Sequence, residues 1–400
     1  MNKMMMRLIP AALLVAFSTQ VSAAAFQLLE QNASGLGVAY AGSAAVADNA
    51  STIFYNPAGM TMLPGRQISL GFNAIGPSYK FTNIGTNSTF GLNGNNGGDA
   101  GGWAAVPNAY VSWQLAPQWF AGLGVSAPFG LATEYEDPNW IGRFHALKSE
   151  IKTVNLNPSL AYRVNDKVAL GFGLNYQRIE AEMSNQTGLG LSRLKGKDSA
   201  WGWNIGALFT LSPAMRVGVS YRSSIQYNLE GTQTIGALPA MSASAKLKLP
   251  DTFTLSVWQQ VSDRWEAMGD LSYTNWSTVD RLNVITPMGV VAEPFGYKDS
   301  WRVAWGAAYK YNDAWKLKFG IAYDRTPVSD LMRSARVPDN NRIWLSLGTQ
   351  WKPARDSVVD VGYAYLYVRD SAINQIKGAV LNGSYDASAH ILGVQFTQGF

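Results

Sequence analysis

The chain has 400 residues, 15% of them charged, and a mean hydropathy of −0.05. A helical inner-membrane transporter would be far more apolar, and a soluble domain usually carries about 25% charged residues. The composition suits a barrel whose alternate residues face lipid and lumen. The absence of cysteine excludes disulfides and thiolate metal sites, and the net charge of +5 is spread without a basic block. We therefore expect no nucleic-acid partner, no metal site and no cofactor.

The first 23 residues predict a secretory signal peptide. Lys3 and Arg7 give a basic start, an apolar run covers residues 8–17, and Val-Ser-Ala at 21–23 is a small-residue cleavage site. The apolar run is too short for a membrane helix. No cysteine follows the cleavage site, so the mature chain is not expected to be a lipoprotein.

Residues 24–64 are rich in Gly, Ala, Ser and Asn and lack the long alternation of the rest of the chain. The barrel predicted for residues 65–400 has a lumen too wide for wall side chains alone to fill. We therefore predict that residues 24–64 form a small N-terminal hatch inside it. The alternative is a disordered periplasmic tail.

Residues 65–400 repeat one unit about every 50 residues: an alternating segment, a long polar loop, another alternating segment and a short turn. Six short turns and seven long loops join about fourteen strands, which describes a bacterial outer-membrane β-barrel. The short turns lie at 116–117, 165–166, 212–213, 262–263, 312–313 and 353–356. The fold class is therefore all-β, a transmembrane antiparallel barrel. We expect a monomer surrounded by outer-membrane lipid and lipopolysaccharide.

The strands near the C-terminus predict which residues face lipid. Leu345 and Leu347 share one face, whereas Ser346 and Gly348 share the other. The apolar faces carry Trp and Tyr at strand ends, as girdles at the membrane interface do. We therefore expect these faces to contact lipid and the lumen to receive Gly, Ala, Asn, Ser and a few charges. The last strand alternates likewise and ends with Phe400, a usual C-terminal signature of outer-membrane barrels.

Several motifs resemble the long-chain fatty acid transporter (FadL) family. They are Ala25-Phe26-Gln27, residues 34–42, residues 47–50, Asn56-Pro57-Ala58, residues 130–134, residues 296–302 and Val337-Pro338-Asp339. The resemblance covers nearly the whole mature chain. It implies a fourteen-stranded barrel plugged by a hatch. It also implies that apolar ligands are captured near the outer surface, enter a pocket and leave sideways through the wall.

The resemblance and the local chemistry together predict a hatch contact and a lateral gate. In the family, the tripeptide Asn56-Pro57-Ala58 lies in the hatch beside the wall opening, and we expect it to contact the wall near Gly130. Pro128 and Gly130 suit an inward kink of the third strand, because Pro removes a ladder hydrogen bond and Gly has no side chain to occupy the space beside it. The alternative is an ordinary strand end before the next loop.

Three positions bear on the ligand pocket. Phe26 matches a hatch residue whose ring reaches the pocket in the family; alternatively, it packs inside the plug. The fatty-acid-binding members hold the carboxylate with two basic residues, and Met183 and Glu293 stand at those places here. Because neither Met183 nor Glu293 is basic, other residues would have to bind the headgroup.

The basic residues that alternation directs inward are Lys298, Arg302 and Arg342. One of them would hold a carboxylate, because a charged headgroup in a dry pocket needs a cation. Alternatively, they pair with wall acids such as Asp324. Without a free cation, the pocket would favour neutral ligands.

The predicted function is passive uptake of hydrophobic small molecules, long-chain fatty acids first and aromatic or aliphatic hydrocarbons as the alternative. A general porin would need an open lumen, against which the hatch argues. A barrel lipase would need a dyad such as Ser388 and His390, but His390 lies on the lipid-facing side of the last strand. We therefore expect no enzymatic activity.

Overall fold

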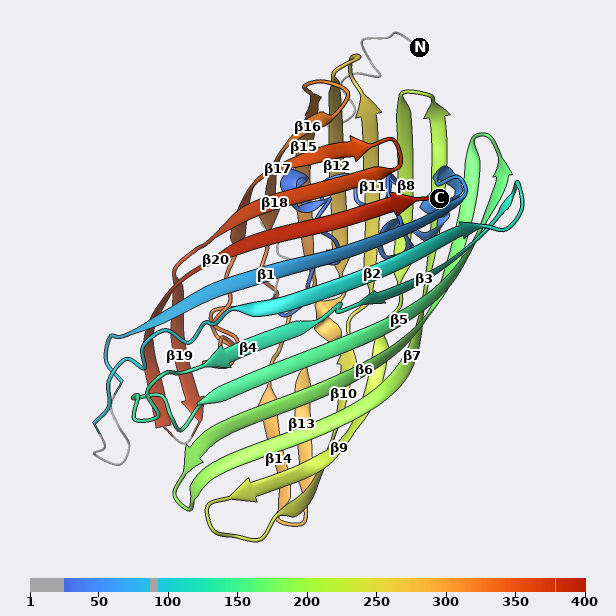
Figure 1. Cartoon of the computed structure of the whole chain (residues 1–400). Coiled ribbons are helices and arrows are strands. Elements are labelled where there is room, and N and C mark those ends of the chain that lie inside the picture. Colours follow the sequence, from blue (N-terminus) through green and yellow to red (C-terminus); the bar gives the residue numbers. More distant parts are fainter. Residues whose placement is uncertain (1–24, 87–92, 378) are drawn as a thin grey trace.

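The computed structural model describes residues 25–86, 93–377 and 379–400 (Figure 1). The predicted signal peptide, residues 1–23, lies outside the described residues. Twenty strands form one closed antiparallel sheet. They are β1 (Arg66–Asn83), β2 (Ala104–Gln114), β3 (Trp119–Ser126), β4 (Gly130–Glu134), β5 (Lys148–Asn165), β6 (Val168–Thr187), β7 (Gly190–Ser212), β8 (Met215–Arg222), β9 (Ile225–Ile235), β10 (Met241–Leu249), β11 (Thr252–Gln260), β12 (Trp265–Thr274), β13 (Arg281–Thr286), β14 (Gly289–Pro294), β15 (Ser300–Lys310), β16 (Trp315–Asp324), β17 (Arg342–Ala354), β18 (Ser357–Val368), β19 (Ser371–Lys377) and β20 (Ala379–Gly399).

Six of the barrel strands are interrupted, each forming two successive strands of the sheet. These are β3 with β4, β8 with β9, β10 with β11, β12 with β13, β14 with β15, and β18 with β19. The twenty segments therefore make fourteen barrel strands, and β20 closes the barrel on β1. The fourteen-stranded antiparallel barrel predicted from the repeat is confirmed.

The short helical segments are η1 (Leu36–Val38), α3 (Thr52–Tyr55), η2 (Pro57–Met62) and η3 (Trp276–Thr278). Within the described residues, no helix has the length and apolar character needed to cross a membrane.

The two ends of the barrel differ. All six predicted short turns are present, for example at 166–167 and 213–214. At the other end, the prediction of seven long loops is wrong in part, because two connections are two-residue hairpins at 188–189 and 287–288. The polar residues expected in those loops instead continue the strands past the membrane.

The predicted inside and outside are confirmed in the membrane region. Leu345 and Leu347 on β17 are exposed, whereas Ser346 is buried against the lumen. An aromatic girdle marks the short-turn end. It includes Trp119 on Tyr162, Trp265 on Tyr309 and Trp315 on Trp351, with ring centroids 4.7, 4.8 and 5.9 Å apart.

The outer part of the lumen is more apolar than expected. On β9, Tyr227 and Leu229 are buried inside, while Glu230 is exposed outside. On β10, Leu247 is buried and Lys248 is exposed. The alternation inverts here because this part of the barrel extends beyond the lipid, so polar residues face water and apolar residues fill the interior. It is the end of the barrel that carries β9 and β14 in Figure 1.

Residues 25–64 lie within the ring of strands (Figure 1) and are mostly buried. Wall glycines allow their backbone to approach closely. A Cβ on Gly320 would lie 2.2 Å from the Val38 carbonyl carbon, and one on Gly348 would lie 2.8 Å from the Gly37 Cα. The buried Lys318 ammonium, on β16, also connects the N-terminal segment to the wall. It donates hydrogen bonds to Ser34 O at 2.8 Å and to Asp360 at 2.7 Å.

Candidate ligand cavity and wall opening

The barrel wall has an opening at the third barrel strand. β2 pairs with β3 as far as Ala109 opposite Val125, and β4 pairs with β5 alone. Residues 104–108 of β2 therefore have β1 as their only strand partner in the described chain. At the outer end the gap closes where Glu134 N donates to Ala100 O at 3.0 Å. These five residues lack a strand partner on the side that faces β3 and β4, which corresponds to an opening roughly 16 Å long.

The missing pairing is replaced by contacts with the N-terminal segment. Leu28 N donates to Pro128 O, and Gly130 N donates to Phe26 O, each at 2.9 Å. The Gln31 side chain also bonds the Ala127 backbone in both directions, at 2.8 and 2.9 Å. The chain between β3 and β4 is therefore turned inward, with Pro128 and Gly130 at the kink.

A cavity of about 660 Å³ connects the lumen with this opening. Its inner wall includes residues of the N-terminal segment, such as Tyr55, and of the far barrel wall, such as Trp344. Its outer edge includes Trp103 and Val154, which are 66% and 58% exposed on the lipid side. The cavity therefore reaches from the lumen to the outer face of the wall.

Pro107 lies on the β2 edge of the opening, whereas Gly130 lies on the other edge. The sequence interpretation missed Pro107. It lies in β2 among the residues without a second strand partner, and it lines the cavity. Proline is confined to strand edges because it cannot donate to a ladder. A proline within an otherwise regular strand was therefore the signal for this edge.

One end of the cavity carries a cluster of charges. Arg302 and Arg342 both lie opposite Asp324 in the strand registers, and all three line the cavity. Arg342 also pairs with Asp339 at 2.7 Å. Arg302 donates to Ala39 O at 2.6 Å, and buried Glu30 lies at the same end. Three carboxyl groups thus accompany two guanidinium groups, so both arginines at this end have acidic residues beside them.

Another side of the cavity carries Arg222, from β8, which the sequence interpretation also missed. Its guanidinium donates to Phe54 O at 2.8 Å and to Asn175 Oδ1, and it lies 4.1 Å above the Phe54 ring. Asn155 Nδ2 donates to the same Asn175 oxygen at 3.1 Å and to Ser126 Oγ at 3.5 Å. Strand alternation would have placed Arg222 in the lumen, but nothing local indicated its contacts.

Comparison with known proteins identifies this architecture. A family model described as "Outer membrane protein transport protein (OMPP1/FadL/TodX)" matches residues 14–400. The chain belongs to this family. It is therefore an outer-membrane protein of a transport family, as the sequence predicted.

Relatives within the OMPP1/FadL/TodX family match along nearly their full length. The chain is 32% identical to outer membrane protein P1 of Haemophilus influenzae, covering 100% of both, and 30% identical to the long-chain fatty acid transport protein of Escherichia coli K12, covering 96% of both. The crystal structure of a Pseudomonas aeruginosa FadL homologue aligns with a TM-score of 0.88 at 25% identity, over 94% of this chain and 100% of that one. The Pseudomonas putida toluene transporter TodX shares the fold, with a TM-score of 0.71 at 16% identity over 92% and 98% of the two chains.

The expected contact between the family's Asn-Pro-Ala tripeptide and the Gly130 region is wrong. Asn56 Nδ2 donates to Ala207 O on β7 at 3.0 Å, and Ala58 packs against Gly171 on β6. Gly171 and Gly130 lie opposite β5 residues 161 and 152, roughly 30 Å apart along that strand. Leu28 is the residue that meets Gly130, because the start of the N-terminal segment runs past the kink.

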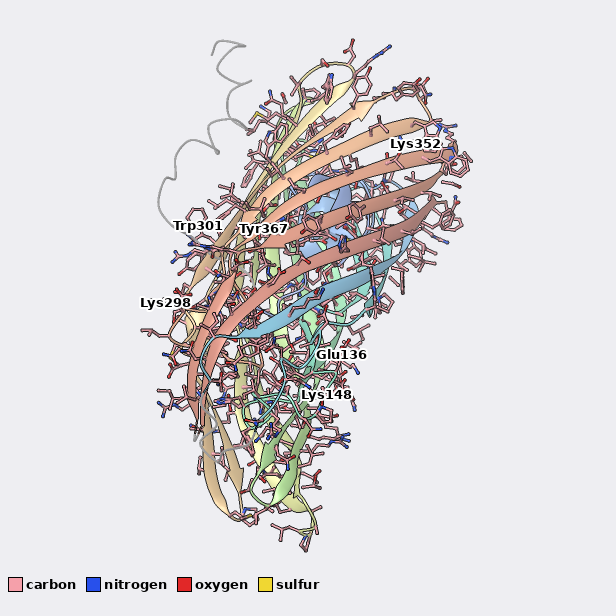
Figure 2. All side chains as sticks on the ribbon, turned by 90° about the vertical axis from the view of Figure 1, so that its left-hand side faces the viewer. Glu136, Lys148, Lys298, Trp301, Lys352 and Tyr367 are labelled. Atoms are coloured by element: carbon pink, nitrogen blue, oxygen red, sulfur yellow. The ribbon has the colours of Figure 1, made fainter. Side chains whose placement is uncertain are left out.

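Among the basic residues expected to face inward, Lys298 does not. Its side chain is exposed, and Figure 2 places it at the outer surface. It belongs to the irregular stretch between β14 and β15, where strand alternation no longer determines direction. Arg302 and Arg342 do face the lumen and line the cavity, close to Asp324, the wall acid considered as their partner.

The remaining family positions lie beside the cavity. Phe26 is 3% exposed, and its ring packs between Phe129 and Trp276 of the barrel chain, with ring centroids at 6.2 and 4.8 Å. The alternative of packing inside the plug is therefore not confirmed either. Met183 packs against the apolar cluster of the outer lumen. Glu293 is buried there, 3.8 Å from Arg336. None of these three side chains is among the described residues that line the cavity.

Proposed function

We propose that this protein takes up hydrophobic small molecules passively across the outer membrane. The ligand is held in the cavity and leaves sideways, between β2 and β4, into the bilayer. Residues 24–64 act as a hatch that closes the lumen below it, and residues 65–400 form the barrel. The observation that carries the proposal is the continuity of the cavity from the lumen to lipid-facing Trp103 and Val154.

The physical chemistry of the ligand favours this route. Each Å² of apolar surface removed from water stabilises the bound state by about 25 cal/mol, so an apolar ligand prefers both the cavity and the bilayer to periplasmic water. A cavity of about 660 Å³ is within the range that holds one drug-sized molecule. Release into the bilayer keeps the ligand apolar throughout, and consumption downstream removes the need for an energy source.

Long-chain fatty acids are the first candidate ligands, consistent with the name of the relative from Escherichia coli. Aromatic or aliphatic hydrocarbons are the second, consistent with the fold shared with the toluene transporter. The acidic residues beside Arg302 and Arg342 favour a neutral ligand at that end of the cavity. The two classes differ in whether a headgroup charge must be accommodated.

The lateral route is tested with Gly130→Arg. A Cβ on Gly130 would be crowded only by the flexible end of Leu28, at 2.8 Å, while the Ile151 carbonyl oxygen lies at an ordinary 3.8 Å, so the long side chain can occupy the gap without breaking the barrel. Because this side chain fills the passage and places a cation on the route of the apolar chain, uptake of labelled oleate by cells should fall about tenfold or more. Gly188→Arg is the matched control, since nothing lies within 4 Å of its added Cβ. Wild-type uptake by a folded Gly130→Arg protein, checked by heat-modifiable gel mobility, would show that the ligand leaves elsewhere.

A further inference from the structure

The cations that line the cavity differ in how their charge is balanced. Lys152 pairs with Glu150 at 2.9 Å at the outer edge. Arg342 pairs with Asp339 at 2.7 Å, and Arg302 lies directly across from Asp324. Each of these three cations has an acidic residue as its neighbour.

Arg222 has no such neighbour among the described residues. Its cross-strand partners are neutral, Asn204 on β7 and Thr252 on β11, and no ion pair within 4.0 Å involves it. Asp270 also lines the cavity, but the strand registers place it roughly 16 Å away along the sheet. Its carboxylate accepts hydrogen bonds from Ser43, Ser256 and Ser272 instead.

A guanidinium buried with neutral partners alone is costly, because carbonyl and amide oxygens offset its desolvation only in part. Ionisable residues kept inside a membrane protein usually mark a ligand pathway for this reason. Arg222 therefore gives its side of the cavity an unbalanced positive charge. The polar groups beside it, Asn175, Asn155 and Ser126, lead from Arg222 to the last residue of β3, next to the wall opening.

We propose that Arg222 binds the carboxylate of an acidic amphiphile, a fatty acid, while its chain lies in the cavity. The hydrogen bond from Arg222 to Asn175 and the stacking on Phe54 hold the guanidinium at the cavity wall. Ser126, at the end of this hydrogen-bonded row, also lines the cavity, so a second polar side chain lies between Arg222 and the opening. This inference rests on the proposed function and assigns the headgroup contact to a residue outside the Lys298, Arg302 and Arg342 set.

A purely structural role for Arg222 makes a different prediction. Arg222 also ties the N-terminal segment to the wall through Phe54 O. Loss of that tie would disturb the cavity for every ligand, whereas loss of an anion contact affects charged ligands alone. The comparison of two ligands with the same chain and different headgroups therefore separates the two roles.

The experiment measures binding of oleate and of oleyl alcohol to the full-length protein in detergent. Arg222→Gln should weaken oleate binding about tenfold or more, as expected for a lost charge-assisted hydrogen bond, and leave oleyl alcohol binding within about twofold. Arg222→Lys should retain most of the oleate affinity. The matched control is Arg216→Gln, on the same strand and face, where the guanidinium lies 4.1 Å above Trp258 and does not line the cavity; it should change neither ligand.

Carboxyl-labelled ¹³C oleate gives a second measurement that needs no variant. Bound to the wild-type protein, its carboxyl should titrate at a lower pH than in detergent micelles, because a nearby guanidinium favours the ionised form. An equal or higher titration point would overturn the proposal, as would equal weakening of both ligands, or of neither, by Arg222→Gln. If wild-type protein bound neither oleate nor oleyl alcohol, the proposed function itself would fail.

Discussion

Replacing Gly320 with valine should loosen the N-terminal segment inside the barrel. Gly320 lies on β16 and faces the lumen, where an added Cβ would be 2.2 Å from the Val38 carbonyl carbon and 2.4 Å from the Ala39 nitrogen. These are backbone atoms, so no side-chain rotation relieves the contact. Valine suits a strand, and the strain therefore falls on residues 36–41 rather than on the barrel.

The size of the effect follows from the geometry. Ordinary Cβ contacts begin at 3.4 Å, so the backbone near Val38 must move by about 1 Å. Overpacking of this kind costs about 1–3 kcal/mol. In one state the N-terminal segment contacts this wall, and in the other it is displaced from it. The equilibrium ratio of the displaced to the contacting state should therefore rise about 5- to 150-fold.

Planar-bilayer recordings measure this ratio as the fraction of time spent in brief openings, and amide hydrogen exchange of residues 36–41 reports it independently. Gly188→Val is the control, because nothing lies within 4 Å of its added Cβ. A fraction of open time and an exchange rate equal to wild type, in a correctly folded barrel, would refute the view that residues 24–64 are seated against this wall as a hatch.

Two further predictions concern the same segment. Deletion of residues 24–64 should raise single-channel conductance in planar bilayers, because a fourteen-stranded lumen is too wide to be filled by wall side chains; an unchanged conductance would argue against the plug. Lys318→Met leaves Asp360 buried without its 2.7 Å partner and should destabilise the protein by about 3–5 kcal/mol, seen as unfolding at lower denaturant concentration. Adding Asp360→Leu should restore most of the loss, and a double variant as unstable as the single one would contradict this account.

The barrel itself was predictable from the sequence because its signals are local. Side-chain direction alternates with a period of two, so Leu345 and Ser346 could be assigned to lipid and lumen from their positions alone. Turn residues separated the strands, which gave their number. Pro128 and Gly130 were assigned to a kink from their individual backbone properties.

Only the tertiary structure decided what the interior contacts. Lys298 was placed wrongly because strand alternation stops where a strand is interrupted, and interruption depends on neighbouring strands. The Asn56-Pro57-Ala58 tripeptide meets β6 and β7 because the whole N-terminal segment must fit the lumen, which no short motif encodes. Arg222 meets Phe54 across 168 residues of sequence. Contacts of this kind arise from closing the sheet, so their energetics cannot be read from a period or a spacing.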